Sequence, residues 1–189
     1  MSDALRVVAL PGSLRRASLN RRLLLEAQRL APDGMVVEIF DLGGIPLFDQ
    51  DVEQQGDPPR VVELKEAIRD ADAVLLGCPE YNHSITGVLK NAIDWASRPP
   101  GKTHLSGKPV ALVGATPGRG ATLRAQAVVR QSLHPLRCWV LPGHEIALAG
   151  AGGLFEDDGR IGDEKTAEAL EKMLAALARW IEKVRGLTA

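Results

Sequence analysis

A short polar loop rich in hydroxyl and guanidinium groups follows the first apolar run of the chain. The segment "GSLRRASLN" (12–20) carries Ser13, Arg15, Ser18 and Asn20, and a leucine-rich helical pattern begins within it. Hydroxyls, an amide and an arginine can hold phosphate oxygens, and the free N–H groups of a helix start favour an anion. A plain strand-to-helix turn, with Ser18 as the helix cap and solvated arginines, explains the same residues equally well.

The spacing of glycines excludes two common phosphate loops. A Walker A loop requires G-x-x-x-x-G-K-[ST], and this loop has neither the second glycine nor the lysine at that spacing. The dinucleotide fingerprint requires three glycines, and here Gly12 stands alone. Because glycine has no side chain, Gly12 is expected to leave room for a ligand near the backbone. If the loop binds an anion, a terminal monophosphate fits best.

Two further loops combine groups that suit a flat heterocycle. "PEYN" (79–82) offers an aromatic ring, an amide and backbone donors, and Tyr81 is the only tyrosine of the chain. The alternative is a tyrosine at a rim and an asparagine that caps the next helix. "TPGRG" (116–120) offers the Thr116 hydroxyl and two glycines, which either admit a ring edge or form an ordinary turn before a helix.

Apolar runs alternate with helical patterns along the whole chain. Strands are expected at 5–10, 35–42, 72–82, 109–116 and 138–148, and helices at 18–31, 60–71, 84–97, 121–136 and about 163–185. The last strand is broken in appearance by Pro142-Gly143. This alternation predicts a parallel sheet covered on both faces, either a Rossmann half or a five-stranded flavodoxin-like sheet. In both, ligands bind beyond the carboxyl ends of the strands, so the three loops are predicted to form one site.

Length and composition fit one domain spanning residues 1–189. With 23 Lys and Arg against 24 Asp and Glu, the chain has no overall basic field to attract nucleic acid or a membrane surface. It has no apolar stretch of the roughly 20 residues needed to cross a bilayer, and its first residues show no signal-peptide pattern. Cys78 and Cys138 are read as reduced, mostly buried thiols. These features predict a cytoplasmic protein without a metal site.

Three motifs in the expected order resemble those of the NAD(P)H-dependent FMN reductase family. They are "GSLRRASLN" (12–20), "PEYNHSITGVLKNAIDW" (79–95) and "TPGRG" (116–120). This family belongs to the flavodoxin-like superfamily and includes bacterial quinone, chromate and azo-dye reductases. The resemblance implies a single flavodoxin-like domain, a five-stranded parallel sheet of order 2-1-3-4-5, and one FMN per subunit.

The resemblance also implies the residues that hold FMN. The phosphate would be bound by Ser13, Arg15, Ser18 and Asn20, with Leu19 counted in the same motif, whereas Arg16 would be solvated or interfacial. The isoalloxazine would lie along Pro79, Glu80, Tyr81 and Asn82, mainly through their backbone, and would meet Thr116 and Gly118. Thr116 stands where the family often has serine, so its position carries a hydroxyl with an added methyl.

A reductase of this family carries hydride on the flavin, so no catalytic side chain is expected. NADPH or NADH would reduce FMN and leave, and a small-molecule acceptor (a quinone, free flavin, azo compound or metal oxyanion) would take its place. His83 and Cys78 are expected to be dispensable. Alternatives are a flavodoxin-type electron carrier and a flavin-binding redox-sensing module. The family implies a homodimer or homotetramer. The helix at 84–97, with Trp95, and the loop beginning near Arg98 would contribute to the interface; the alternative is that Trp95 is a core residue.

Overall fold

A parallel sheet with five strand positions lies at the centre of the computed structural model, which describes residues 4–188. Its strands, in spatial order, are β2 (Met35–Ile39), β1 (Leu5–Pro11), β3 (Ala73–Gly77), β6 (Pro109–Ala115) and, sharing the fifth position, β7 (Trp139–Val140) and β8 (Ile146–Leu148). β1 pairs with both β2 and β3, so the sheet grows outward from it in both directions. The flavodoxin-like order 2-1-3-4-5 is confirmed.

The fifth strand position is interrupted, as Pro142-Gly143 predicts. β7 pairs with the start of β6, where Trp139 lies opposite Pro109, and β8 pairs with its end, where Ile146 lies opposite Val113. The intervening glycine adopts a φ of +74°, a conformation that favours glycine. The chain therefore leaves the edge of β6 and rejoins it beside the loop that follows this strand.

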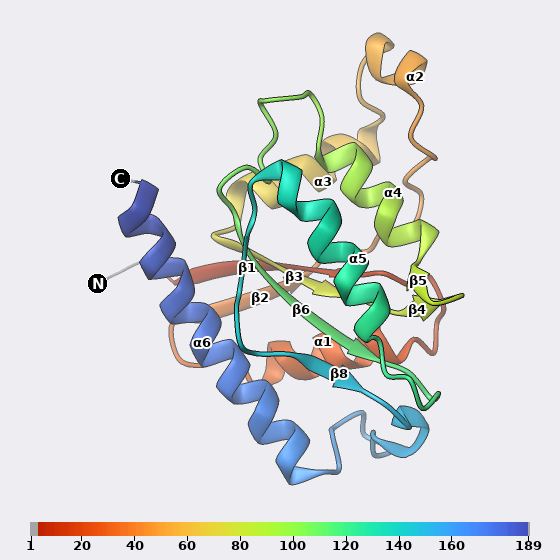
Figure 1. Cartoon of the computed structure of the whole chain (residues 1–189), viewed down its shortest axis with the longest axis vertical. Helices are drawn as coiled ribbons and strands as arrows, with labels where there is room; N and C mark the ends of the chain where they lie inside the picture. Colours follow the sequence, from red (N-terminus) through yellow and green to blue (C-terminus); the bar gives the residue numbers. More distant parts are fainter. Residues whose placement is uncertain (1–3, 189) are drawn as a thin grey trace.

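Helices cover both faces of the sheet (Figure 1). They are α1 (Leu19–Arg29), α2 (Gln50–Gln55), α3 (Pro59–Asp70), α4 (Gly87–Ala96), α5 (Leu123–Leu133) and α6 (Glu164–Thr188), with short 3-10 turns η1 (His134–Leu136) and η2 (Ala151–Gly153). α1 and α6 share one apolar core with the sheet, and α3, α4 and α5 share the other. Alternate residues of β1 enter the two cores: Val7 and Ala9 the first, Val8 and Leu10 the second. A strand buried on both faces explains the continuous apolar run in the sequence.

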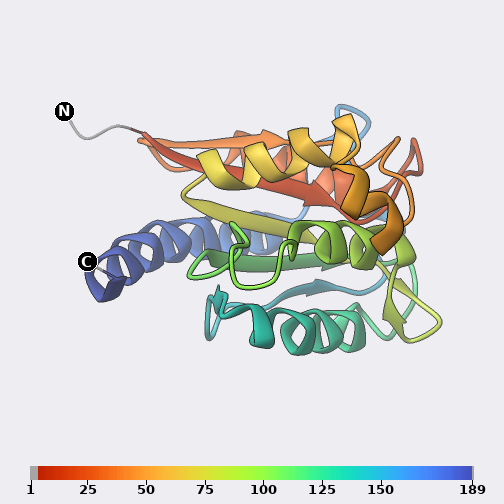
Figure 2. The same ribbon diagram turned by 90° about the horizontal axis from the view of Figure 1, so that it is seen from above.

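A β-hairpin stands where the sequence predicts the end of one strand and the start of a helix. β3 ends at Gly77, and the next residues form β4 (Glu80–Tyr81) and β5 (Ser84–Ile85). Asn82 and His83 both have positive φ and form the two-residue turn that suits a tight hairpin. The strand expected over 72–82 and the helix expected from 84 are therefore wrong at this junction, as is Asn82 as a helix cap. The hairpin projects beyond the sheet, away from the C-terminal end of α6 (Figure 2).

The polar connection between β2 and α3 contains the short helix α2 and is fixed to α4. The Asn91 amide donates to the Pro46 carbonyl and accepts from the Phe48 N–H, and the Trp95 indole N–H also donates to Pro46. Trp95 is fully buried, and its ring meets Phe48 edge-on at 5.0 Å. The hypothesis that Trp95 contributes to a subunit interface is therefore wrong, because the chain itself covers this side chain.

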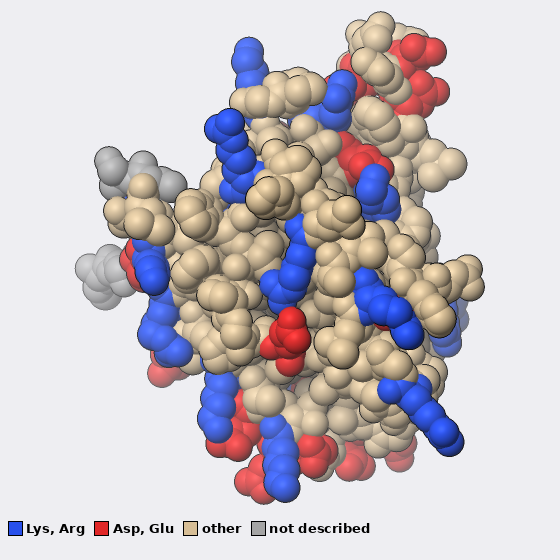
Figure 3. All heavy atoms as spheres, in the orientation of Figure 1, with Lys and Arg blue, Asp and Glu red and all other residues tan. Residues whose placement is uncertain are grey.

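The surface carries both signs of charge. Lys and Arg side chains are interspersed with Asp and Glu over the face in Figure 3, and acidic side chains gather over α2 at its top. None of the helices within residues 4–188 combines the length and apolar character that crossing a bilayer requires.

Candidate functional site

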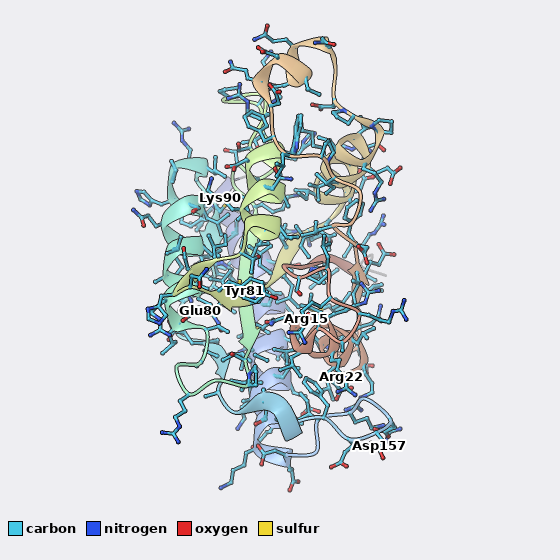
Figure 4. All side chains as sticks on the ribbon, turned by 90° about the vertical axis from the view of Figure 1, so that its right-hand side faces the viewer. Arg15, Arg22, Glu80, Tyr81, Lys90 and Asp157 are labelled. Atoms are coloured by element: carbon cyan, nitrogen blue, oxygen red, sulfur yellow. The ribbon has the colours of Figure 1, made fainter. Side chains whose placement is uncertain are left out.

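The three predicted loops meet in one cleft at the carboxyl edge of the sheet, which Figure 4 shows face-on. The cleft is lined by Ser13, Arg15, Ser18, Leu19, Asn20, Pro79, Glu80, Tyr81, Ala115, Thr116 and Pro117. We call the part formed by residues 13–20 the α1 end, and the part formed by the hairpin and residues 116–120 the hairpin end. Arg15 and Tyr81 approach the cleft from these two ends (Figure 4). Of the predicted residues, Asn82 and Gly118 do not line it.

Two serine hydroxyls at the α1 end are held so that their protons remain available. The Ser13 oxygen accepts the Arg15 N–H at 3.3 Å, and the Ser18 oxygen accepts the Arg21 N–H at 3.2 Å as the cap of α1. Each hydroxyl thus uses an oxygen lone pair for the backbone and retains its O–H as a donor. Both side chains are buried and line the cleft, so they can donate to a ligand oxygen there.

The first turn of α1 adds backbone donors and a cation. Within residues 4–188, the N–H groups of Leu19 and Asn20 donate to no acceptor, as expected at a helix start. Arg15 is exposed and forms no ion pair with any described carboxylate. Hydroxyl protons, free amides and a guanidinium all favour an anion. This donor set fits a phosphate monoester.

The side chain of Asn20 has a different role from the one expected. Its amide nitrogen donates to the Ala115 carbonyl at 2.9 Å, and its oxygen accepts the Ala115 N–H at 3.0 Å. The residue is buried, and its amide ties α1 to the end of β6. The backbone N–H of Asn20 and the second proton of its amide nitrogen remain as donors.

Gly12 is required for contacts inside the protein. A Cβ on Gly12 would lie 2.7 Å from the Gly77 carbonyl oxygen and 2.8 Å from the Pro79 ring, so no side chain fits. The Thr86 hydroxyl caps α4 and donates to the Gly12 carbonyl at 2.7 Å. The expectation that Gly12 admits a ligand is therefore corrected: it lets the first two loops pack against each other. A threonine directly before a helical pattern was a capping signal that sequence reasoning could have used.

At the hairpin end, Pro79 is buried and Tyr81 is half exposed, which gives the cleft an apolar wall. The Glu80 carboxylate turns toward α5, where it pairs with Arg124 and accepts the N–H groups of Arg124 and Ala125. Burial alone would raise the pKa of Glu80, but these hydrogen bonds outweigh it and lower the pKa. Glu80 therefore lines the cleft, but its carboxylate links the hairpin to the start of α5.

The third loop folds back on its own threonine. The Thr116 hydroxyl oxygen accepts the Gly118 N–H at 3.2 Å, so its proton can reach a ligand in the cleft. The Gly118 carbonyl accepts the Gly150 N–H at 3.1 Å, which fixes the loop against the segment after β8. Gly118 shapes the loop from outside the cleft. Ala115 and Pro117, which sequence reasoning did not select, flank Thr116 in the lining.

The two residues set aside as dispensable lie outside the lining. His83 is exposed at the hairpin tip. Cys78 is buried in the core that the sheet shares with α3, α4 and α5, its thiol donates to the Leu76 carbonyl, and burial raises its pKa. Cys138 is partly buried, which raises its pKa to about 12. The interpretation of both cysteines as mostly buried thiols is confirmed. Among residues 4–188, no cluster of His, Cys, Asp and Glu is placed to hold a metal.

Comparisons with known proteins agree with this geometry. The family model described as NADPH-dependent FMN reductase matches residues 5–153. An NAD(P)H-dependent FMN reductase of Pseudomonas aeruginosa is 47% identical over 186 residues, which cover 98% of this chain and 100% of that protein. A quinone reductase of Pseudomonas putida is 39% identical, with coverage of 99% and 100%. The solved structure of FerB, a flavoenzyme NAD(P)H:(acceptor) oxidoreductase of Paracoccus denitrificans, superposes with a TM-score of 0.88 at 36% identity, covering 95% and 98%.

The residues present fit the cofactor that these comparisons imply. The α1 end supplies hydroxyl, amide and guanidinium donors for a phosphate, and the hairpin end supplies an apolar wall and a hydroxyl for a ring. The chain therefore belongs to the NADPH-dependent FMN reductase family and is an FMN-dependent NAD(P)H oxidoreductase with a flavodoxin-like fold.

Proposed function

We propose that the protein transfers electrons from NAD(P)H to quinones, with both substrates using the same open side of the cleft in turn. The observation that carries this proposal is that the three loops meet in one cleft, with phosphate donors at one end and the half-exposed Tyr81 at the other. Relatives described as quinone reductase and 2-hydroxy-1,4-benzoquinone reductase support a quinone as acceptor. Free flavins, azo compounds and metal oxyanions are further proposed acceptors.

The α1 end would anchor the cofactor through Ser13, Arg15 and Ser18. The backbone N–H groups of Leu19 and Asn20 would complete the set of donors to phosphate. FMN held by these residues would supply the two-electron chemistry between the nicotinamide and the acceptor. No described side chain needs to act as a nucleophile, and the site residues above bind and orient.

The hairpin end would orient the ring and leave one side of it accessible. Pro79 and Tyr81 form the wall, and the Thr116 hydroxyl can donate to a heteroatom at the ring edge. If both substrates bind at the same open side of the cleft, the nicotinamide has to leave before the acceptor enters. This predicts ping-pong kinetics.

Initial rates at several concentrations of NADPH and of a benzoquinone test the proposal. Parallel double-reciprocal lines are expected, together with many turnovers per protein. Intersecting lines would contradict the shared position for the two substrates. Bound FMN with a single turnover would favour the electron-carrier or sensor alternative.

We further propose that the chain forms a homodimer or homotetramer in the cytoplasm. Leu47 is 83% exposed even though its neighbours Pro46 and Phe48 are bonded to Asn91 of α4. Such an apolar side chain would lose its contact with water if a second subunit covered it. Size-exclusion chromatography with light scattering should give two or four chains per particle, and a monomer at micromolar concentration would contradict this.

A further inference from the structure

The hairpin that forms one wall of the cleft requires support from outside. Its strands pair only Glu80 with Ile85 and Tyr81 with Ser84. Its turn residues, Asn82 and His83, have φ values of 51° and 63°, a left-handed region that is uncommon outside glycine although Asn and His adopt it more often than most residues. A two-stranded hairpin of this size is marginally stable on its own. The position of the wall therefore depends on the groups that the hairpin contacts.

The strongest polar support is the cap that Glu80 provides for α5. The N-cap residue of this helix, Thr122, forms no side-chain cap, because its buried hydroxyl accepts the Gln126 amide instead. Glu80 Oε2 takes over that role and accepts the N–H groups of Arg124 at 3.1 Å and Ala125 at 3.3 Å. A carboxylate at a helix start satisfies free donors and interacts favourably with the helix dipole.

The Arg124 side chain extends this support to the third loop. Its Nε donates to Glu80 Oε1 at 2.6 Å, and its terminal nitrogen also pairs with this carboxylate. The same guanidinium lies over Gly120, where a Cβ would be 2.5 Å from Arg124 Nη2. One ion pair therefore contacts the hairpin, α5 and the loop of residues 116–120. In Figure 4, Glu80 lies on the side of the hairpin toward α5, and Tyr81 lies toward Arg15.

We propose that the Glu80–Arg124 pair is a positioning element that sets the spacing between the Tyr81 wall and the Thr116–Pro117 wall of the cleft. Glu80 directly precedes Tyr81, which forms one wall. Arg124 contacts the loop of residues 116–120, which forms the other wall. The pair thereby determines how tightly the hairpin end holds the flavin ring. This inference rests on FMN as the cofactor, and it concerns two side chains that act on the ring through the residues they position.

Binding of FMN and of riboflavin, which lacks the phosphate, separates the two ends of the cleft. For Glu80→Gln and for Arg124→Gln we expect the dissociation constants of both ligands to rise about tenfold, because the ring is common to both ligands. The matched control is Asp94→Asn, which breaks the exposed Lys90–Asp94 pair on α4. This control should change both constants less than about twofold. Fluorescence titration of the apoprotein gives both dissociation constants for the unmodified protein and for the three variants.

Two further readouts distinguish positioning from general stabilisation. The visible circular dichroism of bound FMN should change in both variants, whereas a purely structural role would lower only the unfolding temperature of the apoprotein. Amide exchange of Arg124 and Ala125 in the apoprotein should accelerate in Glu80→Gln. In a double-mutant cycle, Arg124→Gln should have little added effect once Glu80 is replaced, because both residues act through one contact.

The proposal is overturned if the variants that fold bind FMN and riboflavin as the Asp94→Asn control does, with unchanged circular dichroism. Arg124→Gln keeps the Glu80 cap on the backbone amides, so it provides the test if Glu80→Gln does not fold. Failure of the unmodified protein to bind either ligand would overturn the FMN assignment on which the proposal rests.

Discussion

The α1 end and the hairpin end of the cleft are held in place by different kinds of contact. At the α1 end, the buried Asn20 amide bonds twice to the backbone of Ala115 on the central sheet. At the hairpin end, Tyr81 is half exposed and its hairpin is tied to α5 through the Glu80–Arg124 pair. A buried amide bonded to a strand is rigid, whereas a hairpin outside the sheet can move more easily. We infer that the α1 end is preformed for phosphate and that the hairpin end is the adjustable part.

Removing the buried cross-link should have the largest effect. Asn20→Ala leaves the Ala115 N–H and carbonyl without partners in the interior, so we expect a loss of about 3 kcal/mol in the free energy of unfolding. Urea unfolding of the apoprotein measures this. The matched control is Asn91→Ala, which also removes an amide bonded to two backbone groups, but in a less buried place. Equal losses in the two variants would show that burial of the Asn20 cross-link adds nothing to the stability of the α1 end.

Acid should weaken the anchoring of α1 at its other end. The Glu26 carboxylate accepts the Ile161 N–H and pairs with Arg29. Burial opposes ionisation of Glu26, but these hydrogen bonds outweigh it and lower its pKa below the ordinary value of 4.5. The folded state thus binds fewer protons than the unfolded state, and stability from this group is present above that value and lost as the pH falls through the lowered pKa.

Glu26→Gln should therefore cost about 2 kcal/mol of unfolding free energy at pH 7 and flatten the decline of stability on the acid side. Urea unfolding at pH values from 3 to 7, in steps of about one pH unit, measures this change in the free energy of unfolding. A variant with the same acid decline as the unmodified protein would show that other carboxyls cause it.

A change in the phosphate donors should affect one ligand and spare the other. Arg15→Gln removes the unpaired guanidinium of the cleft, so we expect FMN to bind about tenfold more weakly, equivalent to about 1.4 kcal/mol, with riboflavin unchanged. Arg16→Gln is the control, since Arg16 is also exposed but does not line the cleft. Equal effects of the two substitutions on FMN would indicate a general attraction between charges and not a specific contact.

The smallest effect is expected at Thr116. Thr116→Ser keeps the hydroxyl and removes a methyl group, so the affinity for FMN should change less than about threefold. Thr116→Ala removes the hydroxyl and should weaken the binding of FMN and of riboflavin equally. Fluorescence titration compares the three proteins. If Thr116→Ala binds both ligands normally, the hydroxyl serves only the turn with Gly118.

Sequence patterns predicted the fold and the location of the cleft because both depend on local signals. Apolar runs alternating with helical patterns predicted the parallel sheet, and Pro142-Gly143 indicated the interruption of the strand position beside β6. The chemical types of Ser13, Arg15 and Ser18 suited an anion site and an ordinary turn equally well, and the resemblance to a known family favoured the anion site. The serine hydroxyls bond to N–H groups two and three residues further along the chain, and such local contacts can be inferred from the sequence.

The direction of individual side chains could not be predicted from the same patterns. Asn20 and Glu80 were expected at the ligand, but their side chains bond to segments 95 and 44 residues away. Gly12 was expected to admit a ligand, and it instead admits Gly77 and Pro79. These contacts depend on which distant backbone groups lack hydrogen-bond partners and on which segments pack together. Both are determined only when the chain has folded.

The visible spectrum of the protein tests the central claim most directly. The apoprotein is mixed with FMN, freed of unbound cofactor by gel filtration, and recorded without oxygen before and after addition of NADPH. We predict a retained flavin spectrum corresponding to one FMN per chain, bleached by one equivalent of NADPH. A protein that keeps no flavin absorbance, or a retained flavin that NADPH does not bleach, would contradict the account.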